Sequence, residues 1–305
     1  MIVVSTARID AARPRAASKL YPLHDGGLIL TVEVPTHPGP GALQAGRDPA
    51  PRPEPPVSMI ERMTLILDAF DGATPTLTLH QLVERTGLPR STVHRILDQM
   101  IRLRWLAHAP GGYRLGLRVL ELGGLAAGHN EIRDAVSPLL HDLCRRSDLD
   151  LVGHLGVLDG REVLYLDKVS GRNTPSVPTR LGGRMPAHST ALGKAMLAAL
   201  EPSVVDASFR DRLPQLTART IGDRVELHRE LTRIRHRQGV AVDNEESVPG
   251  IGCVAVPVRR RGVAVAALSL STRVGADRSA TDISSQARML MGLAREATDL
   301  LAARF

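Results

Sequence analysis

Residues 78–105 read TLHQLVERTGLPRSTVHRILDQMIRLRW, and this stretch decides the fold of the N-terminal part of the chain. Thr78 and Gln81 have the spacing of a capping box, which predicts a short helix that ends at Gly87. Pro89 suits the first turn of a second helix. The apolar stripe of that second helix has helical spacing and consists of Val93, Ile96, Leu97, Met100 and Leu103. Two helices joined by so short a turn predict a helix-turn-helix.

The flanking segments extend this motif to a winged helix-turn-helix domain over residues 58–118. Helical spacing of apolar residues from Ser58 to Phe70 predicts one more helix before the motif. After the motif, two short segments at 105–109 and 113–115 flank Pro-Gly-Gly at 110–112 and predict a hairpin wing. The alternative is an ordinary three-helix domain with a solvated polar face, and the attached wing favours the DNA-binding interpretation.

The second helix of the motif has a basic outer face once its apolar stripe is turned inward. In a helix-turn-helix this helix enters the major groove of DNA. Arginine can bind guanine through two hydrogen bonds or contact phosphate, and serine and threonine reach phosphate or base edges. The predicted DNA-binding residues are Arg90, Ser91, Thr92, His94, Arg95 and Arg102.

Composition agrees with a two-domain soluble protein that binds a polyanion. The chain has 305 residues, 43% of them hydrophobic, and a formal net charge of +7. No apolar run approaches the roughly 18–20 residues that a membrane helix needs. Two cysteines make no disulfide framework, which favours a reducing, cytoplasmic compartment. Because only 2% of residues are aromatic, duplex DNA is a better partner than stacked single strands.

Residues 1–57 are predicted to be a disordered arm. They hold ten of the 21 prolines, a composition that cannot build a core. The apolar segment 28–34 could form a strand, but an isolated strand would have nothing to pack against.

The second half of the chain predicts an α+β domain. Helical patterns at 117–127 and 131–146 suggest a helical linker over 119–147, followed by the second domain at 148–305. Strands at 150–158 and 162–169 are joined by Asp-Gly-Arg, a hairpin signal, and a second hairpin is predicted from 251–258 and 263–271. Further helices are predicted at 189–200, 203–212, 223–238 and 281–303. We expect antiparallel strands with helices packed on one side of the sheet.

Several segments together resemble the IclR-type bacterial transcriptional regulators. Residues 86–97, TGLPRSTVHRIL, look like the helix-turn-helix of that family, and residues 182–195, GGRMPAHSTALGKA, are similar to the helix start of its effector domain. Residues 239–246, GVAVDNEE, with 252–258, GCVAVPV, resemble the family signature, and 267–271, ALSLS, a late strand. The resemblance covers about residues 58–305 and implies a GAF-like effector-binding domain.

A candidate effector site emerges from this second domain. Residues 186–190 place hydroxyls at a helix start, where free N–H groups and the helix dipole favour an anion. Ser269 and Ser271 are two residues apart and therefore share one strand face. The resemblance adds Val177 on a loop that closes the pocket, Ala191 and Leu192 at the helix start, and Asp243 and Cys253. The full predicted set is Val177, His188, Ala191, Leu192, Asp243, Cys253, Ser269 and Ser271.

Structural roles for the same residues remain open at this point. Ser189 or Thr190 can cap its own helix, and His188 can be a hydrogen-bonded core histidine. Cys253 can be a small buried apolar residue, and Glu245 and Glu246 can lie in a solvated loop.

The sequence gives little support to catalysis. It has no Gly-x-Ser-x-Gly, no phosphate-binding glycine loop and no spaced set of zinc ligands, so we expect neither an enzyme nor a metal or other cofactor. A Cys/His/Asp trio of His188, Asp243 and Cys253, or a metal sensor that adds His154, has nothing to bring its members together.

The sequence therefore predicts a ligand-responsive repressor or activator. It would act as a homodimer or homotetramer on a pseudo-palindromic double-stranded DNA operator, with a small organic acid as effector. The alternative is a metabolite-sensing module that binds another protein instead of DNA. Salt-dependent binding to duplex DNA would distinguish the two.

Overall fold

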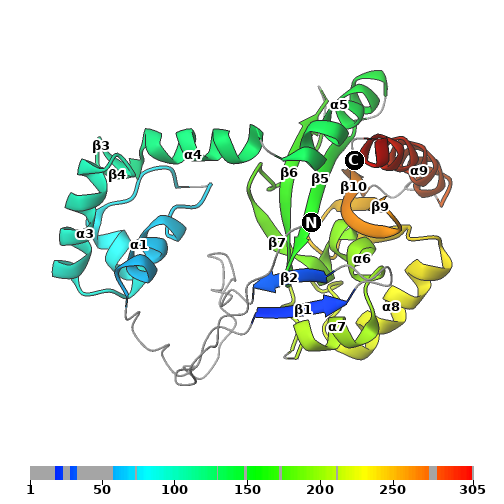
Figure 1. The fold of residues 1–305 in the computed structure, drawn as a ribbon, viewed down its shortest axis with the longest axis horizontal. Coiled ribbons are helices and arrows are strands. Elements are labelled where there is room, and N and C mark those ends of the chain that lie inside the picture. The colour runs from blue at the N-terminus through cyan, green and yellow to red at the C-terminus, as the bar shows by residue number, and fades with distance from the viewer. Residues whose placement is uncertain are drawn as a thin grey trace, which may run out of the picture. The chain divides into compact units, whose positions relative to one another are not determined.

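The computed structural model describes the backbone of residues 18–22 and 28–32, and residues 58–303 apart from 73, 129, 148–149, 172–173, 211 and 275–279 (Figure 1). Near the N-terminus, β1 (Ser18–Pro22) pairs antiparallel with β2 (Leu28–Val32). The sequence predicts a disordered arm over both segments and allows only an isolated strand at 28–34, whereas the strand that forms has a partner at 18–22. The remainder of the arm predicted over residues 1–57 lies outside the described residues.

The winged helix-turn-helix is confirmed. It comprises α1 (Met59–Asp68), α2 (Leu79–Thr86), α3 (Arg90–Arg102), β3 (Leu106–Ala109) and β4 (Gly112–Leu115). The capping box at Thr78 and Gln81 is present, and Gly87 ends α2 in the left-handed conformation with φ of 67°. One apolar core joins the helices and the wing, while Leu103 is 63% exposed. The buried stripe therefore ends at Met100, because α3 ends at Arg102 and Leu103 turns away from the core.

Two helices follow the wing, as the sequence predicted. They are α4 (Leu117–Gly128) and α5 (Glu131–Arg146). Asn130 caps α5 by accepting a hydrogen bond from the backbone of Arg133, and α5 buries one face in the second domain. None of the residues of α4 is buried.

The second domain is built on a six-stranded antiparallel sheet with strand order β7-β6-β5-β10-β9-β8. The two predicted hairpins form it: β5 (Val152–Asp159) with β6 (Glu162–Ser170), and β9 (Ile251–Arg260) with β10 (Val263–Arg273). Short edge strands, β7 (Arg184–Pro186) and β8 (Ala241–Asn244), complete the sheet. These two were not predicted because three or four residues show little alternation.

Helices cover both faces of this sheet, not one face as expected. α5 and α9 (Ala280–Ala303) pack on one face. On the other face lie a 3-10 turn (Ala187–Ser189), α6 (Ala191–Leu197), α7 (Pro202–Ser208) and α8 (Arg224–His236) (Figure 1). The reason is visible in β9, whose residues 251–258 are all buried, since a strand covered on both faces does not alternate. Across the described part of the chain, no helix is long and apolar enough to cross a membrane.

Candidate DNA-reading helix and effector pocket

The outer face of α3 carries the predicted basic residues in exposed positions. Arg90, Ser91, His94, Arg95 and Arg102 are exposed, and Thr92 is half-buried. Within the described residues, the guanidinium groups of Arg90, Arg95 and Arg102 make no hydrogen bond or ion pair. His94 lies 3.3 Å from the Asp98 carboxylate, one turn along the helix. The three arginines are therefore available to an anionic partner.

The turn before α3 is fixed from inside the domain. Leu88 is 4% exposed and packs in the core, so the start of α3 is anchored. Arg85 at the end of α2 donates hydrogen bonds to the Ala69 carbonyl at 2.8 Å and to Asp71 at 2.9 Å. Arg85 thus joins α2 to the end of α1. Pro89 precedes α3 and provides no side-chain cap, so the first N–H groups of α3 can meet a phosphate.

The α6 face of the sheet gathers several predicted effector residues. Ser271 pairs in register with Cys253, and its hydroxyl donates to the Cys253 sulfur at 3.3 Å. Ser269 pairs with His154 on β5, is fully buried, and its hydroxyl has no hydrogen-bond partner in the described structure. A buried hydroxyl without a partner is costly unless a ligand or water satisfies it. Asp243 on β8 pairs in register with Cys253.

A loop lies over this cluster. Val177 in that loop is 8% exposed and packs against Val152 and Ile251. The Lys168 ammonium donates to the carbonyls of Val177 at 2.8 Å and Thr179 at 2.7 Å. His154 forms a 2.7 Å hydrogen bond with the Thr179 hydroxyl. Two side chains of the sheet thus hold the loop in place.

Both parts of the chain match known family profiles. Residues 59–110 match the IclR helix-turn-helix domain, and residues 125–297 match the bacterial transcriptional regulator IclR C-terminal domain. The chain belongs to the IclR family of bacterial transcriptional regulators. It is a DNA-binding regulator of transcription whose second domain is the effector-binding domain that modulates it.

Individual IclR-family proteins resemble the whole two-domain unit. The HTH-type transcriptional regulator XynR of Escherichia coli K12 is 35% identical over 222 residues, which cover 72% of this chain and 87% of XynR. An IclR homologue from Microbacterium hydrocarbonoxydans, solved in complex with 4-hydroxybenzoate, has a TM-score of 0.69 at 28% identity and covers 80% of this chain and 99% of that one. The Thermotoga maritima IclR has a TM-score of 0.63 at 28% identity, with 79% and 98% covered.

Some predicted effector residues of this IclR-family chain have structural partners. His188 is 1% exposed and its ring nitrogen bonds the Pro214 carbonyl at 2.9 Å, while burial lowers its pKa. Thr190, and not Ser189, is the N-cap of α6, because its hydroxyl accepts from the Gly193 backbone. The Ser189 hydroxyl instead donates to the Pro186 carbonyl. Ala191 and Leu192 form the first turn of α6, and both are buried.

Asp243 also has local partners. It is 2% exposed, and its carboxylate accepts from the Glu246 backbone at 2.7 Å and from the Ser247 hydroxyl at 2.6 Å. Burial raises the pKa of Asp243, while these hydrogen bonds and Lys194 act in the opposite direction. Asp243 thus fixes the loop between β8 and β9. In the described part of the chain, no three His, Cys, Asp or Glu side chains converge as a metal site.

A buried ion pair was missed by the sequence analysis. The Lys194 ammonium lies 2.5 and 2.7 Å from the two carboxylate oxygens of Glu246, and the Lys194 side chain is 1% exposed. Burial raises the pKa of the Glu246 carboxyl to about 7, while Lys194 acts in the opposite direction. The interpretation of Glu246 as a solvated loop residue is therefore wrong. A lysine in the apolar segment ALGKAML was the available signal, because a buried ammonium requires a partner.

Proposed function

We propose that this regulator reads its operator with α3 and responds to a small organic acid bound on the α6 face of the sheet. The segment boundaries that we propose are 58–118 for the winged domain, 119–147 for the linker and 148–305 for the effector domain. The observation that carries the effector proposal is Ser269, a fully buried hydroxyl without a partner beside Cys253 and Ser271. The relatives are named as transcriptional regulators, and this supports a role in regulation rather than catalysis. For this chain we propose that it acts in the cytoplasm, where chromosomal DNA lies.

The DNA-binding set that we propose consists of Arg90, Ser91, Thr92, His94, Arg95 and Arg102. The support is their common face on α3 and the free guanidinium groups described above. Residues near the start of such a helix meet base edges, whereas Arg102 at its end suits a phosphate.

Arg95→Ala should weaken specific operator binding by about 1–3 kcal/mol while leaving the fold and the oligomer intact. Arg95 is exposed and has no protein partner in the described structure, so its loss costs only the DNA contact. Fluorescence anisotropy at fixed salt measures the affinity. Arg229→Ala on α8 is the matched control, since it removes the same charge from an exposed position away from α3. Equal affinity of Arg95→Ala and wild type would exclude α3 as the reader.

The proposed effector set consists of Val177, His188, Ala191, Leu192, Asp243, Cys253, Ser269 and Ser271. Within it, Ser269 offers a hydroxyl to the effector, and the first turn of α6 offers N–H groups to a carboxylate. His188 and Asp243 act by shaping the walls, because their polar atoms already have protein partners. An acid that also carries a hydroxyl, as 4-hydroxybenzoate does in the Microbacterium relative, has the chemistry that this pocket suits.

Calorimetry against a panel of small organic acids and their uncharged amides tests this pocket. We expect acids to bind and the amides to bind at least roughly tenfold more weakly, since the dipole at the start of α6 favours negative charge. Cys253→Leu should block binding and abolish ligand-induced change in operator affinity, whereas Cys253→Ala adds no bulk and should retain it. Ser271→Ala should weaken binding. Amides that bind as well as acids, or a Leu variant that responds normally, would exclude an anionic pocket at this place.

We also propose that two or four copies assemble, with α4 as a contact between copies. Leu117 is 68% exposed and Leu120 is 72% exposed, although both are apolar. Gly123 and Gly124 leave room for close approach of a second helix. A pseudo-palindromic operator needs two reading heads. An effector would then change DNA affinity by favouring one arrangement of the heads, and such coupling is typically about 1–3 kcal/mol.

A further inference from the structure

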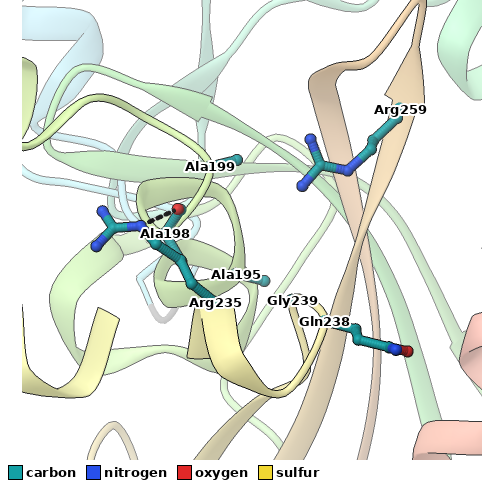
Figure 2. A pocket seen from close by; sticks show the side chains of 7 residues that line it. All are labelled: Ala195, Ala198, Ala199, Arg235, Gln238, Gly239 and Arg259. Carbon is teal, nitrogen blue, oxygen red and sulfur yellow. Dashed lines mark hydrogen bonds between the residues drawn. The ribbon is translucent and has the colours of Figure 1, made fainter. Parts of the chain in front are cut away.

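A second cavity lies at the opposite end of α6 from the proposed effector pocket. Its volume is about 250 Å³. Ala195, Ala198 and Ala199 line it from α6 and the residues just after it (Figure 2). The other walls come from the end of α8 and from β9. No residue of the proposed effector set lines this cavity, so the two sites are distinct.

Two arginines line the cavity, and each is held by the backbone. Arg235 donates to the Ala198 carbonyl at 2.8 Å and to the Leu200 carbonyl at 3.3 Å. Arg259 donates to the Gly262 carbonyl at 2.8 Å, and Figure 2 shows its guanidinium pointing from β9 toward Ala199. A guanidinium has five N–H donors. Most donors of both arginines therefore remain available.

The charge of the cavity is unbalanced. None of the described residues that line it is acidic. Neither Arg235 nor Arg259 has a carboxylate partner in the part of the chain that the structure describes. Arg235 lies at the carbonyl end of α6, where its charge partly offsets the partial negative charge of that helix end. The cavity thus carries positive charge that no carboxylate among the described residues pairs with.

The remaining walls are small and apolar or neutral. Ala195 and Ala198 are 1% and 5% exposed and Gly239 is buried, whereas Ala199 and Gln238 lie at the exposed mouth. Gly239 has φ of 90°, a conformation that favours glycine, and a Cβ added there would lie 2.9 Å from Cδ of Pro257, so no larger residue fits at this wall. An apolar cavity of about 150 Å³ can hold benzene. This cavity is large enough for a ring or short chain that carries an anionic group.

From these observations we propose that the cavity between α6, the end of α8 and β9 binds a small organic carboxylate, with Arg259 as its main anion contact. A guanidinium matches the two oxygens of a carboxylate in one plane. The alanines and Gly239 accommodate the carbon skeleton. Because α6 begins at the effector pocket and ends here, a carboxylate in this cavity contacts the same helix as the effector.

The test is calorimetry with benzoate, citrate and inorganic phosphate on the full chain that carries Cys253→Leu, which closes the proposed effector pocket. We expect benzoate or citrate to bind, and Arg259→Gln to weaken that binding roughly tenfold or more. Ala199→Leu should also abolish it, since it fills the cavity and leaves the charges unchanged. Arg237→Gln is the matched control, because Arg237 is exposed near Arg235 but does not line the cavity.

Each result decides the proposal. Carboxylate binding that survives both Arg259→Gln and Ala199→Leu would overturn it, as would absence of benzoate and citrate binding at millimolar concentration. Binding of phosphate alone would assign the site to inorganic anions and overturn the carboxylate class. If Cys253→Leu does not fold, or leaves another carboxylate site open, calorimetry should resolve two binding events, of which Arg259→Gln and Ala199→Leu each remove the same one and leave the other unchanged. An effector pocket placed wrongly would thus change the Cys253→Leu result and not the loss of one binding event in Arg259→Gln.

Discussion

Lys194→Met should lower the free energy of unfolding by about 3–5 kcal/mol, the usual cost of removing one partner from a buried ion pair. Lys194 is almost fully buried, and Glu246 is 9% exposed. Methionine fills similar space but leaves the Glu246 carboxylate without its cation. The backbone carbonyl of Glu246 also accepts a hydrogen bond from the Thr220 hydroxyl at 2.6 Å. This bond keeps the loop that carries Glu246 in place in the variant, so the Glu246 carboxylate stays buried without a cation. Urea unfolding at pH 8 measures the loss.

The pH dependence of this loss identifies its cause. Without Lys194, the pKa of Glu246 should rise above about 7, since Lys194 is the main influence that lowers it. The folded state then binds a proton that the unfolded chain releases, so stability falls as the pH rises. The loss of unfolding free energy that Lys194→Met causes, relative to wild type, should therefore be larger at pH 8 than at pH 5. Lys194→Met combined with Glu246→Leu should recover much of the stability. If Lys194→Met alone lowered the free energy of unfolding by less than about 1 kcal/mol at pH 8, the result would contradict this account.

Much of the winged helix-turn-helix domain could be predicted, because the sequence patterns that specify it are local. The capping box at Thr78, the left-handed Gly87 and the stripe from Val93 to Met100 each lie within a few residues of the contacts that they make. The prediction that Leu103 belongs to the buried stripe was wrong for a local reason as well, since α3 ends one residue before it. Periodicity cannot say where a stripe stops.

The effector domain could be predicted only in part, because its site depends on distant contacts. Ser269 and Ser271 were placed on one strand face by their spacing, and the structure puts them on one face. Lys194 and Glu246 are 52 residues apart, and no local pattern links them. Lys168 and His154 hold a loop through Thr179, 11 and 25 residues away. Long-range pairs of this kind follow from strand order, which a single sequence does not specify.

Acidification should destabilise the effector domain through His154. Burial lowers the pKa of this histidine to about 3, with Lys168 lowering it further and Asp167 acting in the opposite direction. In the unfolded chain the ring has its ordinary pKa near 6.5. Between these values the unfolded state binds the proton and the folded state does not, so stability is full above about pH 6.5 and is lost as the pH falls. At about 1.4 kcal/mol per pH unit, His154 should account for a loss of about 3 kcal/mol by pH 4.

Urea unfolding between pH 4 and pH 8, in wild type and in His154→Gln, isolates this contribution. Glutamine keeps a polar group near Thr179 but takes up no proton, so the difference between the two stability curves should narrow as the pH falls. His94→Gln is the matched control, because it makes the same substitution on the exposed face of α3. Parallel curves for wild type and His154→Gln would show that His154 does not carry the acid sensitivity. A narrowing difference would instead tie acid stability to the His154–Thr179 hydrogen bond, and so to the loop that covers the proposed effector pocket.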